Sequence, residues 1–289
     1  MRTETYRFAG ITAQITMPRE WFPEQENKLE PFRSTPSGKV HRFVFQKAET
    51  LPEPQGSLLT EQPNFFVLSG EDAKIRYIGA RRESWENAYI RAEHGDTEHR
   101  ILLRESRIPG KIGAKIILES IAAEHLIARN HGFIFHCSYI EHNGKAILFT
   151  APSGTGKSTQ AELWKEHRGA EIINGDRAAV RLADGRLLAE GIPFAGSSQY
   201  CKNRSLPIAA IIYLGQASET SIRKLRGYEA FSKIWEGVSV NTWDKEDMEL
   251  VSGVVQKVAE QIPVYHLPCT PDESAVIALE AELRKLVKV

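Results

Sequence analysis

A short segment near the middle of the chain combines two glycines, a lysine and hydroxyl side chains. It reads Ala-Pro-Ser-Gly-Thr-Gly-Lys-Ser over residues 151–158. Glycine lets the backbone curl so that several N–H groups point at one anion. A lysine brings a cation to the outer phosphates of a nucleotide, and a serine hydroxyl after it is a ligand type for Mg²⁺. The segment therefore predicts a phosphate-binding loop for a nucleotide, formed by Ser153, Gly154, Thr155, Gly156, Lys157, Ser158 and Thr159.

The elements on either side of this loop fit the same interpretation. An apolar run at 146–149 predicts a strand before it, and residues 158–167 predict a helix after it. Strand, glycine loop, Lys-Ser and helix is the layout of a P-loop, whose helix adds its positive N-terminal end to the anion site. The usual first glycine of the motif is Ala151 in this chain. Alanine is sterically acceptable there because the position ends the strand.

Phosphoryl transfer also needs a group that binds metal or accepts a proton. Asp176 follows a short apolar run and is the best-placed carboxylate for either role, and its alternative is an ordinary turn residue in Asn-Gly-Asp. Glu190, at the end of another run, is a candidate for a second carboxylate that binds the metal or the substrate. His136 is a candidate catalytic residue beside the transferred phosphoryl group, with a core histidine as the alternative. The basic cluster 223–226 is interpreted as a solvated face.

Composition excludes several classes of protein. In 289 residues, Lys+Arg and Asp+Glu number 37 each, so the chain has no overall basic field for binding nucleic acid. The longest apolar run, 207–214, is too short to span a membrane, and residues 1–6 lack the apolar region of a signal sequence. The 3 cysteines are widely spaced and are interpreted as thiols of a reducing compartment. We therefore expect a cytoplasmic protein with no nucleic-acid or membrane partner.

The pattern of elements predicts two domains. Before residue 105, short apolar runs at 5–17, 40–45, 64–68, 73–78, 88–92 and 99–103 favour a smaller, mainly β domain with antiparallel strands. Residues 107–110 are typical of a junction, and one helix is expected over the apolar positions from Ile112 to Ile127. The rest is typical of an α/β domain. We expect strands at 133–140, 146–150, 171–173, 178–182, 186–190 and 208–214, and helices at 229–235, 247–261 and 272–286.

The surroundings of the P-loop resemble a known family. Residues 135–149, including His136, resemble the strand–turn–strand before the P-loop of the HPr kinase/phosphorylase family, which shares its catalytic fold with phosphoenolpyruvate carboxykinase. Residues 169–176 resemble the family's buried strand ending in an acidic pair. In this chain a glycine, Gly175, occupies the position of the first acidic residue. The resemblance covers about 110–280. It implies a phosphoenolpyruvate-carboxykinase-like, HPr-kinase-like P-loop domain at 106–289. The N-terminal domain at 1–105 resembles no known family, and we expect it to recognise the substrate.

This resemblance implies an ATP- and Mg²⁺-dependent kinase that transfers the γ-phosphoryl group to a hydroxyl, first of all a serine of a small protein or peptide. In that role Asp176, His136 and Lys157 are the expected catalytic residues, and Ser158, Asp176 and Glu190 the expected metal ligands. Two alternatives stay open: a small-molecule kinase acting on a free hydroxy amino acid, and a non-catalytic nucleotide-dependent binding module. The oligomeric state, a homo-oligomer included, is left open.

Overall fold

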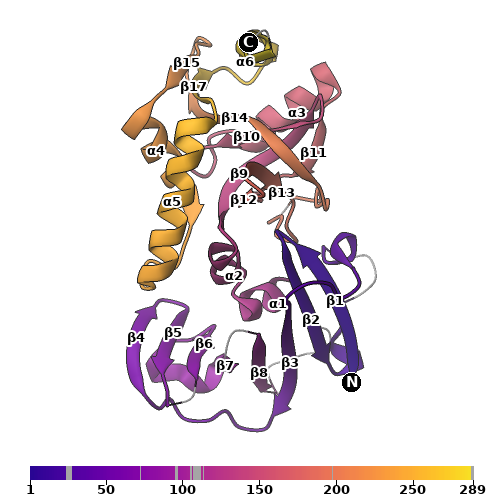
Figure 1. Ribbon diagram of the computed structural model, residues 1–289, viewed down its shortest axis with the longest axis vertical. Coiled ribbons are helices and arrows are strands. Elements are labelled where there is room, and N and C mark those ends of the chain that lie inside the picture. Colours follow the sequence, from indigo (N-terminus) through magenta and orange to yellow (C-terminus); the bar gives the residue numbers. More distant parts are fainter. Residues whose placement is uncertain are drawn as a thin grey trace. The chain divides into compact units, whose positions relative to one another are not determined.

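The computed structural model of the protein describes residues 1–23, 28–71, 73–94, 97–104, 106, 112, 114–196 and 198–287. It divides into two compact units, Met1–Ala123 and Glu124–Val289 (Figure 1). The junction predicted at 107–110 lies outside the described residues. Both units contain a β-sheet and the chain as a whole mixes α and β structure, as expected. Among the described helices, none has the length and apolar character needed to cross a bilayer.

The N-terminal unit is built on a sheet with strand order β1-β2-β3-β8-β7-β6-β5-β4 among the described residues. Its strands are β1 (Arg2–Phe8), β2 (Ile11–Met17), β3 (Val40–Ala48), β4 (Ser57–Gln62), β5 (Phe65–Ser69), β6 (Lys74–Ile78), β7 (Tyr89–His94) and β8 (Glu98–Arg104). The short 3-10 helices η1 (Arg19–Trp21), η2 (Glu30–Phe32) and η3 (Arg82–Asn87) and the helix α1 (Ala114–Ile121) complete the unit.

This sheet differs from the expected antiparallel one in its pairing. β3 runs parallel to both of its neighbours, β2 and β8. Parallel neighbours need long connections, and here residues 18–39 join β2 to β3 while β4 to β7 separate β3 from β8. The single run expected at 5–17 is a hairpin, because Ala9 and Gly10 turn the chain with φ of 46° and 70°. β4 was not predicted, since most of its side chains are exposed and show no apolar alternation.

The helix expected from Ile112 to Ile127 is two helices. α1 ends at Ile121, and α2 (Ala123–Arg129) follows. Ala122 between them has a φ of 52°, a left-handed conformation that a continuous α-helix cannot contain. The Ser120 hydroxyl donates to the Ile116 carbonyl oxygen at 2.7 Å, a contact that tends to bend helices. The border between the two units follows this break directly.

The C-terminal unit contains a second, mixed sheet. Its strands are β9 (Gly132–His142), β10 (Lys145–Thr150), β11 (Glu171–Asn174), β12 (Arg177–Ala183), β13 (Arg186–Glu190), β14 (Ser205–Gln216), β15 (Arg223–Leu225), β16 (Val238–Ser239) and β17 (Val264–Cys269). The order is β10-β9-β12-β13-β14-β17-β15, with β11 and β16 paired to β9. A parallel pairing of β10 with β14 closes β10, β9, β12, β13 and β14 into a ring.

Helices cover this sheet on two sides. α4 (Gly227–Trp235) and α5 (Lys245–Gln261) contribute to one apolar cluster, while α3 (Lys157–Arg168) and α6 (Glu273–Val287) contribute to another. Because side chains alternate along a strand, β10 serves both clusters. Ala146 and Leu148 belong to the first, and Ile147 and Phe149 to the second. The predicted strands and helices of this unit are confirmed, whereas β15, β16 and β17 were missed.

Candidate active site

The glycine loop connects the end of β10 to the start of α3. Gly154 and Gly156 have φ of 80° and 114°, which L side chains rarely adopt. A Cβ atom at either position would meet nothing within 4 Å, so glycine is needed for its backbone conformation and not for space. Gly156 caps α3 without a side-chain hydrogen bond. The first N–H groups of α3 therefore have no capping side chain, and this is the geometry in which helix N-termini bind anions.

Hydrogen bonds within the loop hold Lys157 over its own backbone. Nζ of Lys157 donates to the carbonyl oxygens of Ala151 and Pro152 at 2.9 and 3.2 Å. The Thr155 hydroxyl also donates to Pro152, at 2.9 Å. Only 8% of Lys157 is exposed, and this burial lowers the pKa of its ammonium below the ordinary value. Lys157 is thus a desolvated cation whose present partners are neutral carbonyl groups.

Asp176 lies just beyond β11, in a turn that a buried asparagine organises. Oδ1 of Asn174 accepts hydrogen bonds from the backbone N–H groups of Asp176 and Arg177 at 2.9 and 3.0 Å. Nδ2 of Asn174 donates to the carbonyl oxygens of Ile192 and Phe194 at 3.1 and 2.6 Å. Asn174 therefore ties this turn to the segment after β13. Asn174 is a site residue that was not predicted, although an Asn two residues before a candidate carboxylate is a recognisable Asx-turn signal.

The carboxylate of Asp176 faces two side chains. Nε2 of His136 lies 3.5 Å from Oδ1, and Nε of Arg177 lies 3.2 Å from Oδ2. β9 and β12 pair with His136 opposite Arg177, so the sheet register brings the two to the same carboxylate. The His136 side chain is the largest cause that lowers the pKa of Asp176 below its ordinary value, with Arg177 adding to it against the effect of burial.

Ser158 and Asp176 line one pocket of about 420 Å³ at the start of α3, together with Glu162, Gly175, Ser198 and Tyr200. The structure thus brings the predicted hydroxyl and the predicted carboxylate to the same space. A Cβ atom at Gly175 would collide with the Ser198 side chain, 2.7 Å from its Cβ and nearer still to its hydroxyl. The loop that carries Ser198 therefore fills the place where a side chain at 175 would begin.

Glu190 has partners of its own outside this pocket. Its carboxylate accepts hydrogen bonds from Nε and a terminal nitrogen of Arg181 at 2.7 and 3.2 Å. The Ser205 hydroxyl donates to it at 3.1 Å. Glu190 is not among the residues that line the pocket of Ser158 and Asp176. These contacts give Glu190 a place in the packing of β12, β13 and β14, and its metal role stays a prediction.

A second group of side chains that could bind a metal lies where α2 and the start of α5 meet. Ligand atoms of His125, Asp244 and Asp247 lie within 4.8 Å of one another. Nε of Arg129 donates to Asp247 at 3.1 Å, and the Asn241 amide donates to it at 2.9 Å. A guanidinium group therefore already supplies the positive charge that these carboxylates need. The group is explained as an ion-pair network.

Comparisons with known proteins assign no family. No family model matches the chain, and no curated protein matches it. Among solved structures the chain is similar to an HPr(Ser) kinase/phosphatase from Coxiella burnetii, at 12% identity over 53% of this chain and 88% of that one, with a TM-score of 0.33. A likeness at this level does not establish common function.

Proposed function

We propose that the protein is an ATP- and Mg²⁺-dependent kinase that transfers the γ-phosphoryl group to a hydroxyl, first of all a serine of a small protein or peptide. The observation that carries this proposal is that Ser158 and Asp176 line one pocket at the start of the helix that follows the glycine loop. A hydroxyl and an ionised carboxylate beside an uncapped helix N-terminus are the groups that phosphoryl transfer requires.

The ATP phosphates would be bound by the loop residues 153–159. The N–H groups at the start of α3 would bind these phosphates without competition from a capping side chain. Lys157 would exchange two neutral carbonyl partners for charged phosphate oxygens, and charge-assisted hydrogen bonds are about twice as strong as neutral ones. Because Lys157 is buried, its attraction to a phosphate is screened less than that of a surface lysine.

The residues fit a magnesium ion. Mg²⁺ prefers oxygen ligands, and Ser158 and Asp176 supply a hydroxyl and a carboxylate in one pocket. The lowered pKa of Asp176 keeps that carboxylate ionised at neutral pH, as a metal ligand must be. When bound, the ion would neutralise negative charge on the transferred phosphoryl group.

The same carboxylate is the proposed proton acceptor. The oxygen of the acceptor hydroxyl forms a bond to the γ-phosphorus, the bond from that phosphorus to the ADP oxygen breaks, and the hydroxyl proton passes to Asp176. A carboxylate with a low pKa is a weak base, so the proton is transferred late, when the attacking oxygen has become more acidic. His136 and Arg177 hold the carboxylate in place from two sides.

One observation bears on the alternatives. A non-catalytic binding module would be favoured if Asp176 pointed away from the P-loop, and the shared pocket speaks for catalysis instead. The choice between a peptide and a hydroxy amino acid as acceptor depends on the experiment that follows.

The test is a labelling experiment. The full chain and its Lys157→Ala variant are each incubated with ATP radiolabelled in the γ-phosphoryl group and with host-cell extract, and macromolecules are separated from small molecules. A protein or peptide that is labelled with the wild-type chain and not with the Lys157→Ala variant supports the proposal. Label confined to a small molecule contradicts the peptide acceptor. Nucleotide binding without transferred label contradicts the kinase and leaves the binding module.

A further inference from the structure

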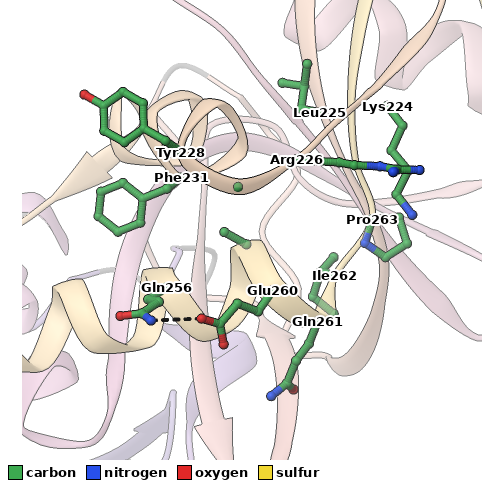
Figure 2. Close-up of a pocket in the computed structure, with 12 residues that line it drawn as sticks. Lys224, Leu225, Arg226, Tyr228, Phe231, Gln256, Glu260, Gln261, Ile262 and Pro263 are labelled. Atoms are coloured by element: carbon green, nitrogen blue, oxygen red, sulfur yellow. Dashed lines mark hydrogen bonds between the residues drawn. The ribbon is translucent and has the colours of Figure 1, made fainter.

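A second pocket of about 680 Å³ lies in the C-terminal unit, between α4 and the C-terminal part of α5 (Figure 2). The end of β15 and the residues that lead into β17 close it at one end. It shares no lining residue with the pocket of Ser158 and Asp176. The volume is within the usual range for binding pockets. We call it the α4–α5 pocket.

Apolar side chains form the walls of the α4–α5 pocket. α4 and α5 pack on each other through buried residues such as Ile234 and Val255. Tyr228 and Phe231, three residues apart on α4, line the pocket together with Ala259 of α5. Tyr228 is 84% exposed, the most exposed large apolar side chain among the described residues. Aromatic side chains are enriched at protein interfaces.

The rim of the pocket is cationic. Lys224 and Arg226 are both exposed and line the end near Pro263 (Figure 2). In the described part of the chain neither has a carboxylate partner, whereas the neighbouring Arg223 is paired with Glu229 at 2.9 Å. Among the lining residues Glu260 is the only acid, and it accepts a hydrogen bond from Gln256 at 2.9 Å. The charge that would complement this rim is negative.

We propose that the α4–α5 pocket docks an acidic peptide segment of a partner protein, one that carries carboxylates beside a large apolar side chain. An apolar centre with a polar rim is the usual anatomy of a protein interface. A small anion would gain nothing from Tyr228 and Phe231, and an uncharged apolar peptide would gain nothing from Lys224 and Arg226. This docking goes beyond the proposed kinase activity, because it needs neither nucleotide nor Asp176.

The test selects ligands without assuming a sequence. The full chain, free of nucleotide, is used to select binders from a displayed library of random short peptides, and the best binder is synthesised with a fluorescent label. We expect selected peptides that pair Asp or Glu with Leu, Phe or Trp. Binding of the labelled peptide is then measured by fluorescence polarisation. Selection of no peptide, or of peptides without an acidic residue, would overturn the proposal.

Matched variants locate the site. Lys224→Glu and Arg226→Glu should each weaken binding of the labelled peptide by about tenfold or more. Lys257→Glu makes the same charge change at an exposed position of α5 outside the pocket, and should leave binding within about twofold. Tyr228→Ala should weaken binding, and Ile277→Ala, at a 53% exposed position of α6, should not.

The structure of the variants is checked by thermal unfolding. All substituted side chains are exposed, so the melting temperatures should stay close to that of the wild type. Equal losses of binding in Lys224→Glu and Lys257→Glu would show a general charge effect and would contradict the assignment of the α4–α5 pocket as the peptide-binding site. Unchanged binding in Lys224→Glu, Arg226→Glu and Tyr228→Ala would overturn it as well.

Discussion

Nε2 of His136 lies 3.5 Å from Oδ1 of Asp176, although the two residues are far apart in the sequence. The backbone strengthens this relationship, since the N–H of Cys137 donates to the carbonyl oxygen of Asp176 at 3.1 Å. β9 thereby fixes both the main chain and the side chain of Asp176 from one side. A candidate base or metal ligand is held in one orientation before any substrate binds, which is what preorganised sites require.

The first prediction concerns the ionisation of this carboxylate. His136→Ala should raise the pKa of Asp176 toward its ordinary value, because the neighbouring His136 side chain is the largest cause of the lowering. A carboxyl whose folded-state pKa is lowered stabilises the protein above its unfolded-state pKa, and this is lost as pH falls through the folded-state pKa. The variant should therefore be less stable than the wild type at neutral pH, and the difference in stability should become smaller in acid. Carboxyl carbon NMR titration measures the shift.

Asp272 is the internal control for this titration. Its pKa is lowered by Ser274 and Thr270, not by His136, so it should titrate unchanged in the variant. An unchanged pKa of Asp176 in His136→Ala would contradict the role given to His136.

The second prediction follows from the contact between Gly175 and Ser198. Gly175→Ala should destabilise the protein by about 1–3 kcal/mol, the usual cost of overpacking, because the new Cβ would collide with the Ser198 side chain. Ser198→Gly removes that side chain and should recover most of the loss when both changes are combined. Urea unfolding of the two single variants and the double variant measures the coupling. Additive losses would show that the loop does not press on Gly175.

The sequence predicted the C-terminal unit better than the N-terminal one. β13 was predicted with its observed bounds, because Asp184-Gly185 marks a tight turn and both residues have left-handed φ, 49° and 74°. β15 and β16 are too short for a periodic signal. In the N-terminal unit the parallel neighbours of β3 could not be foreseen, since the direction of pairing depends on how the long connections run and not on local periodicity.

In the candidate site, too, some features could be predicted from the sequence and others could not. Spacing and residue type pointed to Gly154, Lys157 and Ser158, because a P-loop is contiguous in sequence. Asp176 was named for ending a strand, but its contact with His136 depends on the pairing of β9 with β12. Register of this kind is set by the whole sheet. The Ser198 contact with Gly175 joins a loop to a turn, and no sequence rule predicts it.

The third prediction separates stability from function at Lys157. In the absence of nucleotide, Lys157→Met should melt at or above the wild-type temperature, because a buried cation with a lowered pKa is replaced by an apolar side chain of similar length. ATP should raise the melting temperature of the wild type and not that of the variant. Phosphoryl transfer should fall about 100-fold or more. A variant stabilised by ATP as much as the wild type would contradict the phosphate-binding role of Lys157.

The last prediction distinguishes the two predicted metal carboxylates. Asp176→Asn should lower the rate of phosphoryl transfer by about 100-fold or more and leave the affinity for ATP largely unchanged. The reason is that the amide can neither accept the proton nor balance a metal charge beside Ser158. Glu190→Gln should instead lower the melting temperature, since the Glu190 carboxylate is paired with Arg181 inside the sheet, and should leave the Mg²⁺ dependence of transfer unchanged. Initial rates over a magnesium titration and thermal unfolding of both variants give the comparison. If Glu190→Gln shifted the magnesium dependence and Asp176→Asn stayed active, the assignment of Asp176 would be wrong and Glu190 would be the metal ligand.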